Sequence, residues 1–260
     1  MHEAYAHERE KLDSDFKARL AAMQNELNQL KGINAEDDTT TGRTHQNAFA
    51  SKSFDTFETM MERRRIEDSI VDPSYRKVTL ADDDGANPKI SKICRKYVDQ
   101  WDKVSTENIG ILFRGPVGTG KSFFACCIAN ELLKKRVPTA VTSFPRLLNL
   151  LQNSKDRQGL LDRLSTYKLL VIDDLGVERD TGYAAEQIFA VIDARCRSNF
   201  PTIVTTNLTP QEMDAPETMQ YKRIFDRVTE MCPVSLLVDG ESRRIQNAQR
   251  RKEIARELLL

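Results

Sequence analysis

Hydrophobic and polar positions follow two different rhythms over the later part of the chain. Short apolar runs, typical of buried strands, are separated by longer amphipathic stretches, typical of helices. The predicted strands cover residues 109–114, 139–143, 168–173 and 202–206. The predicted helices cover residues 88–101, 122–135, 144–164 and 184–197. Strands that alternate with helices of this length form a parallel sheet covered by helices on both faces, so the sequence predicts an α/β fold.

The first part of the chain has a different pattern. Residues 1–32 predict one long helix, because apolar positions recur close to a heptad repeat with charged residues between them. Such a helix can lie on the main domain or form a coiled coil with a partner, and we favour the coiled coil. Residues 33–52 are polar and aperiodic, as in a linker, and residues 55–70 predict a second helix. We therefore expect an N-terminal helical, partner-binding region over residues 1–70 and a second domain over residues 71–260.

Composition adds mainly exclusions. The 39 basic and 39 acidic residues cancel, so the net charge indicates no polyanionic partner, although a local basic patch can still bind nucleic acid. The five cysteines form no Cys-x-x-Cys pair and all three histidines precede residue 46, which disfavours zinc and disulfide frameworks. No apolar run approaches the roughly 20 residues of a membrane span, and the first residues do not resemble a signal peptide. We expect a cytoplasmic protein with no membrane partner.

A glycine-rich turn joins the first predicted strand to the next helix. Its sequence satisfies G-x-x-x-x-G-K-[ST], and the strand before it and the helix after it supply the context that this motif requires. The residues expected to bind ATP are Gly115, Pro116, Val117, Gly118, Thr119, Gly120, Lys121 and Ser122. The glycines allow backbone N–H groups to point at phosphate oxygens. Lys121 is expected to reach the β- and γ-phosphates, and the Ser122 hydroxyl to coordinate Mg²⁺.

Polar side chains also end two later strands. Asp173 and Asp174 follow an apolar strand, and Asn207 follows the strand after it. The carboxyl ends of parallel strands meet at the crevice where ligands bind, so these residues are expected beside the phosphates. We assign Asp173 to the Mg²⁺ site, Asp174 to activation of the attacking water, and Asn207 to holding that water. Asp174 stands where a glutamate is usual and is one methylene shorter.

These motifs resemble, in sequence order, the AAA+ helicase loaders of the DnaC/DnaI type and the related transposition helper IstB. Residues 222–228 resemble the box that carries the arginine finger, and residues 240–244 resemble the sensor-2 segment. The resemblance implies an AAA+ sheet, with Arg227 acting on the ATP of a neighbouring subunit and Arg243 touching the γ-phosphate of its own. For the adjacent Arg223 and Arg244, a surface ion pair is an equally good interpretation.

The resemblance implies a Mg²⁺-dependent ATPase of DNA replication, slow when alone, that forms an ATP-dependent homo-oligomer. It would bind single-stranded DNA and deliver a replicative helicase through its N-terminal region. The alternative is an IstB-like helper that acts on duplex DNA with a transposase, and a plain P-loop kinase is disfavoured by the two arginine segments. The N-terminal region lacks a zinc-ligand set, which leaves the identity of its partner open. The candidate DNA contacts are Arg146, Lys155, Arg157 and Arg163.

Overall fold

The computed structural model describes residues 63, 65–176, 182–216 and 218–259. The chain divides into two units, Met1–Glu58 and Thr59–Leu260, and every described residue belongs to the second. The predicted long helix and linker lie outside the described residues, so the predicted N-terminal region remains a prediction. Within the described residues, no helix combines the length and the apolar character that crossing a membrane requires.

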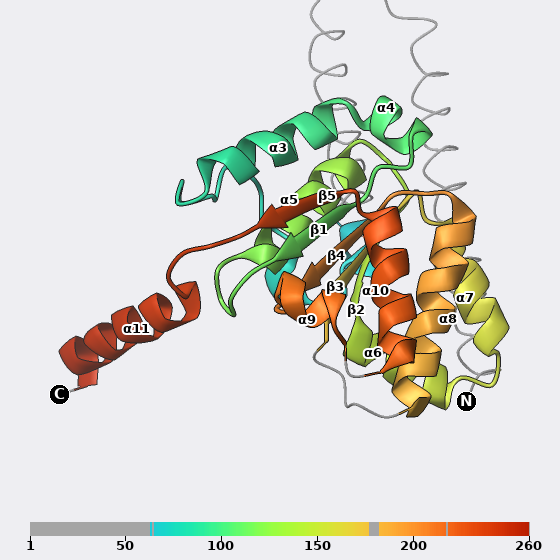
Figure 1. Cartoon of the computed structure of the whole chain (residues 1–260). Helices are drawn as coiled ribbons and strands as arrows, with labels where there is room; N and C mark the ends of the chain where they lie inside the picture. Colours follow the sequence, from blue (N-terminus) through green and yellow to red (C-terminus); the bar gives the residue numbers. More distant parts are fainter. Residues whose placement is uncertain (1–62, 64, 177–181, 217, 260) are drawn as a thin grey trace, which may run out of the picture. The chain divides into compact units, whose positions relative to one another are not determined.

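A sheet of five parallel strands forms the centre of the domain, in the order β2-β3-β4-β1-β5 (Figure 1). The strands are β1 Ile111–Arg114, β2 Thr139–Ser143, β3 Leu169–Leu175, β4 Thr202–Thr206 and β5 Val234–Leu237. The central strands are buried on both faces, which explains their continuous apolar sequence. This confirms the predicted α/β fold with a parallel sheet flanked by helices.

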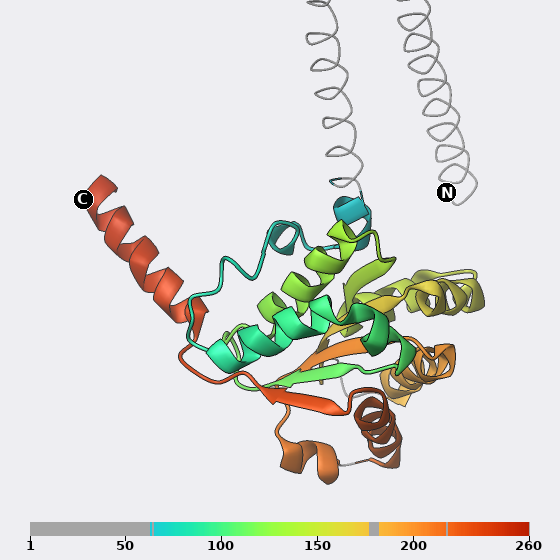
Figure 2. The same cartoon turned by 90° about the horizontal axis from the view of Figure 1, so that it is seen from above.

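Helices cover both faces of the sheet and enclose two hydrophobic cores. On one face lie η2 Pro73–Tyr75, α3 Pro88–Asp99, α4 Trp101–Thr106 and α5 Lys121–Lys134. On the other lie α6 Phe144–Asn153, α7 Arg157–Thr166, α8 Gly182–Ser198, α9 Pro210–Asp214 and α10 Met219–Met231. Figure 2 shows these two layers with the sheet between them.

Several element boundaries differ from those predicted. The helix predicted over residues 144–164 is interrupted between α6 and α7, because the Asp156 carboxylate accepts from Gly159 N–H and starts a new helix. Strand β5 went unpredicted because it is an edge strand whose burial alternates. The chain then continues into α11, Arg243–Leu259, which extends away from the sheet in both views (Figures 1 and 2).

The start of the described chain belongs to this domain. Ile70 is fully buried and pairs with Val141 of β2 in an isolated parallel bridge. Asn130 of α5 donates to the carbonyl oxygens of Tyr75 and Val78, at 2.8 and 2.9 Å. These contacts fasten the segment before α3 to the helix that follows the glycine-rich turn.

Candidate nucleotide-binding site

The glycine-rich turn lies between β1 and α5, at the carboxyl edge of the sheet. Gly118 and Gly120 have φ angles of 86° and 108°, which side-chain-bearing residues rarely adopt. A Cβ at Gly118 would lie 2.1 Å from Ser242 Oγ, and a Cβ at Gly120 would lie 2.2 Å from Arg243 Nη1. Glycine is therefore required here both by backbone conformation and by the close approach of the chain that enters α11.

Lys121 begins α5 and is almost completely buried. Its Nζ donates to the carbonyl oxygens of Gly115 and Pro116, at 2.8 and 2.7 Å. Burial lowers the pKa of Lys121, and the carboxylates of Asp174 and Asp173 oppose this shift. The turn thus holds a cation at the N-terminus of a helix, where the helix dipole also favours an anion.

Two hydroxyl groups hold the carboxylate of Asp173. Ser122 Oγ donates to Asp173 Oδ1 at 2.8 Å, and Thr205 Oγ1 donates to the same oxygen at 2.5 Å. Burial raises the pKa of Asp173, whereas the Thr205 hydrogen bond opposes the rise. The motifs at 115–122 and 168–174 are therefore joined by a direct side-chain contact across 51 positions.

A β-bulge contains the two acidic residues of β3. The register of β3 with β4 shifts between Ile172 and Leu175, and Asp174 has a φ of 61°. In a regular strand neighbouring side chains point to opposite faces, and a bulge changes that direction. Of the two carboxylates, Asp174 does more than Asp173 to raise the pKa of Lys121. The bulge therefore lets both acids act at one edge of the sheet.

Thr205 is a site residue that sequence analysis did not assign. Its Oγ1 donates to Asp173 and accepts from the backbone N–H of Asp174 at 3.0 Å. The available signal was a polar residue at the end of an apolar strand. Asn207, which was assigned, is half-buried and directly follows the last residue of β4.

The ligands expected for Mg²⁺ are compatible with this geometry. Ser122 and Asp173 already share a hydrogen bond, and a hydroxyl and a carboxylate are hard oxygen donors of the kind that Mg²⁺ prefers. The buried lysine and the glycine backbone offer a positive potential that would suit phosphate groups. The residues present fit both a triphosphate and a divalent cation.

Arg243 lies against the glycine-rich turn. Its backbone N–H donates to Gly118 O at 3.0 Å, and its Nη1 donates to Thr119 O. Its Nε and Nη2 donate to the two carboxylate oxygens of Asp84, at 2.7 and 2.6 Å. The Arg243 hydrogen bonds are the main reason why the pKa of Asp84 falls to about 2. Arg243 therefore belongs to this site, and three of its five N–H groups already have partners.

Arg227 lies elsewhere, on α10 where this helix packs against α8. Its Nη1 donates to Glu230 at 2.7 Å and lies 4.0 Å from the Cys196 sulfur. Met231, the last residue of α10, accepts from Gly110 N–H, just before β1 begins. The end of α10 is therefore at the amino edge of the sheet, whereas the glycine-rich turn is at the carboxyl edge. Arg227 takes no part in the phosphate site of its own chain.

The four candidate DNA contacts are exposed. Arg146 lies on α6, Lys155 in the turn that follows, and Arg157 and Arg163 on α7. Arg157 also donates to Leu151 O at 3.1 Å and so helps to end α6.

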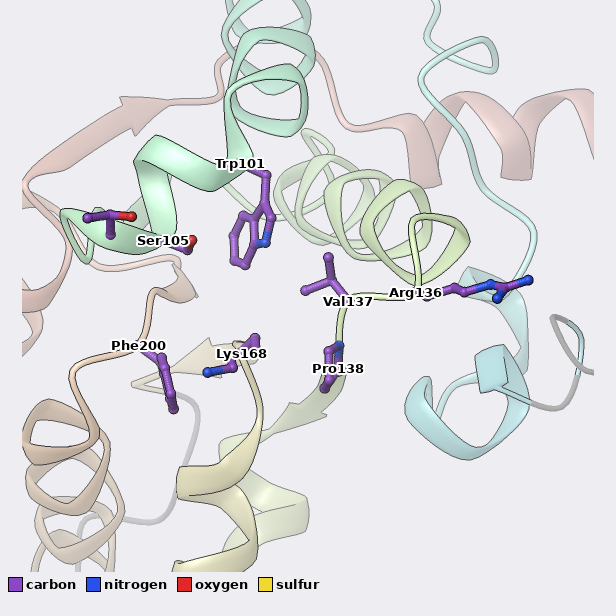
Figure 3. A pocket seen from close by; sticks show the side chains of 8 residues that line it. Trp101, Ser105, Arg136, Val137, Pro138, Lys168 and Phe200 are labelled. Carbon is purple, nitrogen blue, oxygen red and sulfur yellow. The ribbon is translucent and has the colours of Figure 1, made fainter.

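A hollow of about 390 Å³ lies away from the phosphate site (Figure 3). It is lined by Trp101, Ser105, Thr106, Arg136, Val137, Pro138, Lys168 and Phe200. The Lys168 ammonium lies 3.9 Å from the centre of the Phe200 ring. Val137, Lys168 and Phe200 all precede strands, which places the hollow at the amino edge of the sheet. It is therefore separate from the glycine-rich turn.

Comparison with known structures supports the fold. The crystal structure of DnaI aligns with a TM-score of 0.56 at 24% identity, over 67% of this chain and 95% of that one.

Two curated relatives share sequence with this chain. The replicative helicase loader DnaI of Bacillus subtilis is 29% identical over 149 residues, which are 52% of this chain and 47% of the relative. The "Insertion sequence IS232 putative ATP-binding protein" of Bacillus thuringiensis is 35% identical over 144 residues, 53% of this chain and 56% of the relative. The chain thus spans about half the length of the curated relatives that it matches.

The family model of the IstB-like ATP binding proteins matches residues 96–251, which contain the glycine-rich turn, the β3 carboxylates and the start of α11. This match covers more than half of the chain and confirms the resemblance seen in the sequence: the chain belongs to the IstB-like ATP binding proteins.

Proposed function

We propose that this chain is a Mg²⁺-dependent ATPase of the AAA+ type that acts in DNA replication as a helicase loader. The observation that carries the ATPase assignment is the contact of Ser122 and Thr205 with Asp173, beside the buried Lys121. This arrangement supplies a cation for the phosphates and two oxygen donors for a divalent metal ion.

The positions of the side chains support the following proposed roles. Lys121 and the backbone of residues 115–122 bind the phosphates, and Ser122 and Asp173 hold the metal ion. When bound, Mg²⁺ neutralises charge on the phosphate oxygens. Asp174 accepts a proton from the attacking water, and Asn207 orients that water. The water oxygen bonds to the γ-phosphorus while the bond to the β,γ-bridging oxygen breaks.

The arginines complete the proposed site. Charge that develops on the transferred phosphoryl group needs more positive charge than one lysine supplies. Arg243 comes from the same chain, at the start of α11. Arg227 would come from a neighbouring copy, because in its own chain it lies towards the amino edge of the sheet, whereas the glycine-rich turn is at the carboxyl edge. Hydrolysis by the isolated chain is then slow, and ATP promotes assembly of a homo-oligomer.

The helicase-loader role is supported by the identity to DnaI. Loading requires a surface for the helicase, for which we propose the N-terminal region, and a surface for single-stranded DNA, for which we propose the cations of α6 and α7. A transposition helper acting on duplex DNA is the second candidate, and the 35% identity to the IS232 protein supports it.

Binding of the full chain to its partners separates these two roles. Purified protein is mixed, in the presence of ATP and Mg²⁺, with the replicative helicase or with a transposase of the same source. A helicase loader retains the helicase. It loses the helicase when Leu20 and Leu27, two apolar positions of the heptad pattern predicted over residues 1–32, are both replaced by Glu. Retention of the transposase alone, with preference for duplex over single-stranded DNA, would replace the loader role with the helper role.

The ATPase assignment has its own test. Asp174→Asn removes the proton acceptor but keeps the size of the side chain, so ATP binding is retained and Mg²⁺-dependent phosphate release falls about 100-fold. Release of phosphate at the wild-type rate by this variant would remove Asp174 from the mechanism.

A further inference from the structure

The chain that leads from β5 into α11 lies along the glycine-rich turn. Val238 N–H donates to Arg114 O at 2.8 Å, just before the turn begins, and Arg243 N–H donates to Gly118 O at 3.0 Å. The backbone at the start of α11 is therefore fixed against the loop that is proposed to bind ATP.

The side chain of Arg243 reaches the end of the same turn. Its Nη1 donates to Thr119 O, and this nitrogen would clash with a Cβ placed on Gly120. Gly120 directly precedes Lys121, the buried lysine that begins α5. These contacts put the guanidinium beside the residues assigned to the phosphates, as the proposed role of Arg243 at the γ-phosphate requires.

Asp84 holds this guanidinium from the opposite side. Its two carboxylate oxygens accept from Nε and Nη2 of Arg243, at 2.7 and 2.6 Å. Paired hydrogen bonds of this kind fix the orientation of an arginine as well as its position. Asp84 is itself oriented by Ala86 N–H, which donates to it at 3.0 Å. The orientation of Arg243 over the turn is therefore set by a segment 159 positions earlier in the chain.

Neither stability nor simple charge accounts for this carboxylate. The side chain of Asp84 is 48% exposed, and ion pairs at such sites contribute little to stability. Hydrogen bonds from Arg243 lower the pKa of Asp84 to about 2, so it is charged at neutral pH. A negative charge beside a phosphate site repels ATP unless it acts through the arginine.

Arg243 keeps hydrogen-bonding capacity in this arrangement. Of its five N–H groups, three donate to Thr119 and Asp84, and no bond to any other described residue is recorded for the remaining two. These two belong to Nη1 and Nη2, the nitrogens at the tip of the side chain. A fixed guanidinium with two donors left is suited to phosphate oxygens.

We propose that Asp84 is a positioning residue for Arg243: it holds the guanidinium on the glycine-rich turn so that the remaining N–H groups meet the γ-phosphate, and it thereby sets a preference for ATP over ADP. This inference rests on the proposed ATP-binding function and on the role of Arg243 within it. The ATP site then includes an acidic residue that lies outside every nucleotide-binding motif of the sequence.

The test compares two nucleotides on the full-length protein with Mg²⁺: ADP, and an ATP analogue whose β,γ-bridging oxygen is replaced by a methylene group. Asp84→Asn keeps the side-chain size but loses the paired contact. We expect its dissociation constant for the analogue to rise about tenfold, and that for ADP to change less than about twofold, because ADP has no γ-phosphate. A residue that only maintained the fold of the turn would affect both nucleotides alike.

Three further variants control this comparison. Arg243→Ala shows the same selective loss, and adding Asp84→Asn to it causes no further loss, because Asp84 acts through Arg243. Asp84→Glu keeps the charge and restores most of the affinity for the analogue. Asp82→Asn, in the same acidic run, removes a carboxylate that accepts from Thr79 and leaves both affinities unchanged.

Unchanged or tighter binding of the analogue by Asp84→Asn would overturn this inference, as would equal weakening of both nucleotides or normal binding by Arg243→Ala. Failure of the proposed function is reported separately by Lys121→Ala. If Lys121→Ala binds both nucleotides normally, the site itself is wrong. If Lys121→Ala loses both while Asp84→Asn behaves as wild type, only the role of Asp84 is wrong.

Discussion

Thr205 Oγ1 lies 2.5 Å from Asp173 Oδ1 and donates a hydrogen bond to it. The same hydroxyl oxygen accepts from Asp174 N–H at 3.0 Å. One side chain of β4 thus positions the carboxylate assigned to Mg²⁺ and the backbone of the residue assigned to water activation. Strand pairing between β3 and β4 brings these groups together.

Replacing Thr205 by Val removes both hydrogen bonds while keeping the shape of the side chain. We expect the free energy of unfolding to fall by about 1–2 kcal/mol, and hydrolysis at saturating ATP to fall about tenfold. Thr206→Val is the matched control, because Thr206 Oγ1 donates to Leu175 O. It should lose similar stability but keep its hydrolysis rate. Equal hydrolysis rates in both variants, measured as phosphate release, would leave Thr205 with a structural role only.

Burial of Asp173 predicts a pH dependence of stability. Its pKa in the folded protein is raised above the ordinary 3.8, so the folded state binds the proton more tightly than the unfolded chain. The contribution of Asp173 to stability is therefore highest at acidic pH. It is lost as the pH rises from the ordinary value through the raised one, and remains absent at neutral pH.

Asp173→Asn removes the metal ligand. It also removes the free-energy cost of burying a charged carboxylate at neutral pH. At pH 7 we expect the variant to unfold at a higher temperature than wild type, because the buried charged carboxylate is gone. The difference shrinks as the pH approaches 4, and Mg²⁺-dependent hydrolysis is lost. Calorimetry across this pH range measures the effect, with the exposed Asp226→Asn as control. A variant less stable than wild type at pH 7 would contradict the predicted sign.

Arg227 can be tested by mixing subunits. Arg227→Ala should keep ATP affinity but lose hydrolysis about 1000-fold, as expected for a finger supplied by a neighbour. A Lys121→Ala subunit cannot bind ATP but still offers Arg227, so adding it to Arg227→Ala subunits restores part of the phosphate release.

Arg223→Ala provides the comparison on the same helix, one turn nearer its start. Loss of hydrolysis in Arg223→Ala but not in Arg227→Ala would transfer the role to Arg223. No loss in either variant, and no restoration on mixing, would indicate a site complete within one chain.

The basic residues of α6 and α7 predict how DNA binding depends on salt. Replacing Arg146, Lys155, Arg157 and Arg163 by Gln should weaken binding of single-stranded DNA in proportion to the phosphates lost. The slope of log affinity against log salt should become shallower by up to about 3, because each lost phosphate contact contributes roughly 0.7 to the slope. Replacing Lys89, Lys92, Lys96 and Lys103 on the other face is the control. Equal slopes in wild type and both variants would exclude this surface.

The sequence alone predicts the part of the candidate site in which residue type dictates chemistry. Glycines, a lysine and a hydroxyl at fixed spacing predict phosphate binding because few other groups can surround phosphate oxygens. The apolar run before Asp173 predicts a buried parallel strand, and the structure has one. These signals are local in the sequence, so they can be recognised without knowing the fold.

What the sequence did not reveal depends on contacts between distant segments. Arg195 lies in the helix predicted over residues 184–197, and no role was predicted for it from the sequence. The structure shows it fully buried, donating to the carbonyl oxygens of Tyr167 and Pro201, both at 2.7 Å. Burial lowers its pKa to about 10. Asp84 likewise belongs to an irregular acidic run, and only the fold brings it to Arg243. No local pattern marks either residue.

The central claim is that the turn before α5 binds ATP through Lys121. It is tested most directly by titrating the protein with ATP in the presence of Mg²⁺ and measuring the binding by calorimetry. The full-length protein is compared with Lys121→Ala and with Lys134→Ala, which removes an exposed lysine paired with Glu131 on the same helix. We predict wild-type affinity for Lys134→Ala and at least a 100-fold weaker affinity for Lys121→Ala, because the buried cation that faces the phosphates is gone. Equal ATP affinity in all three proteins would contradict the account.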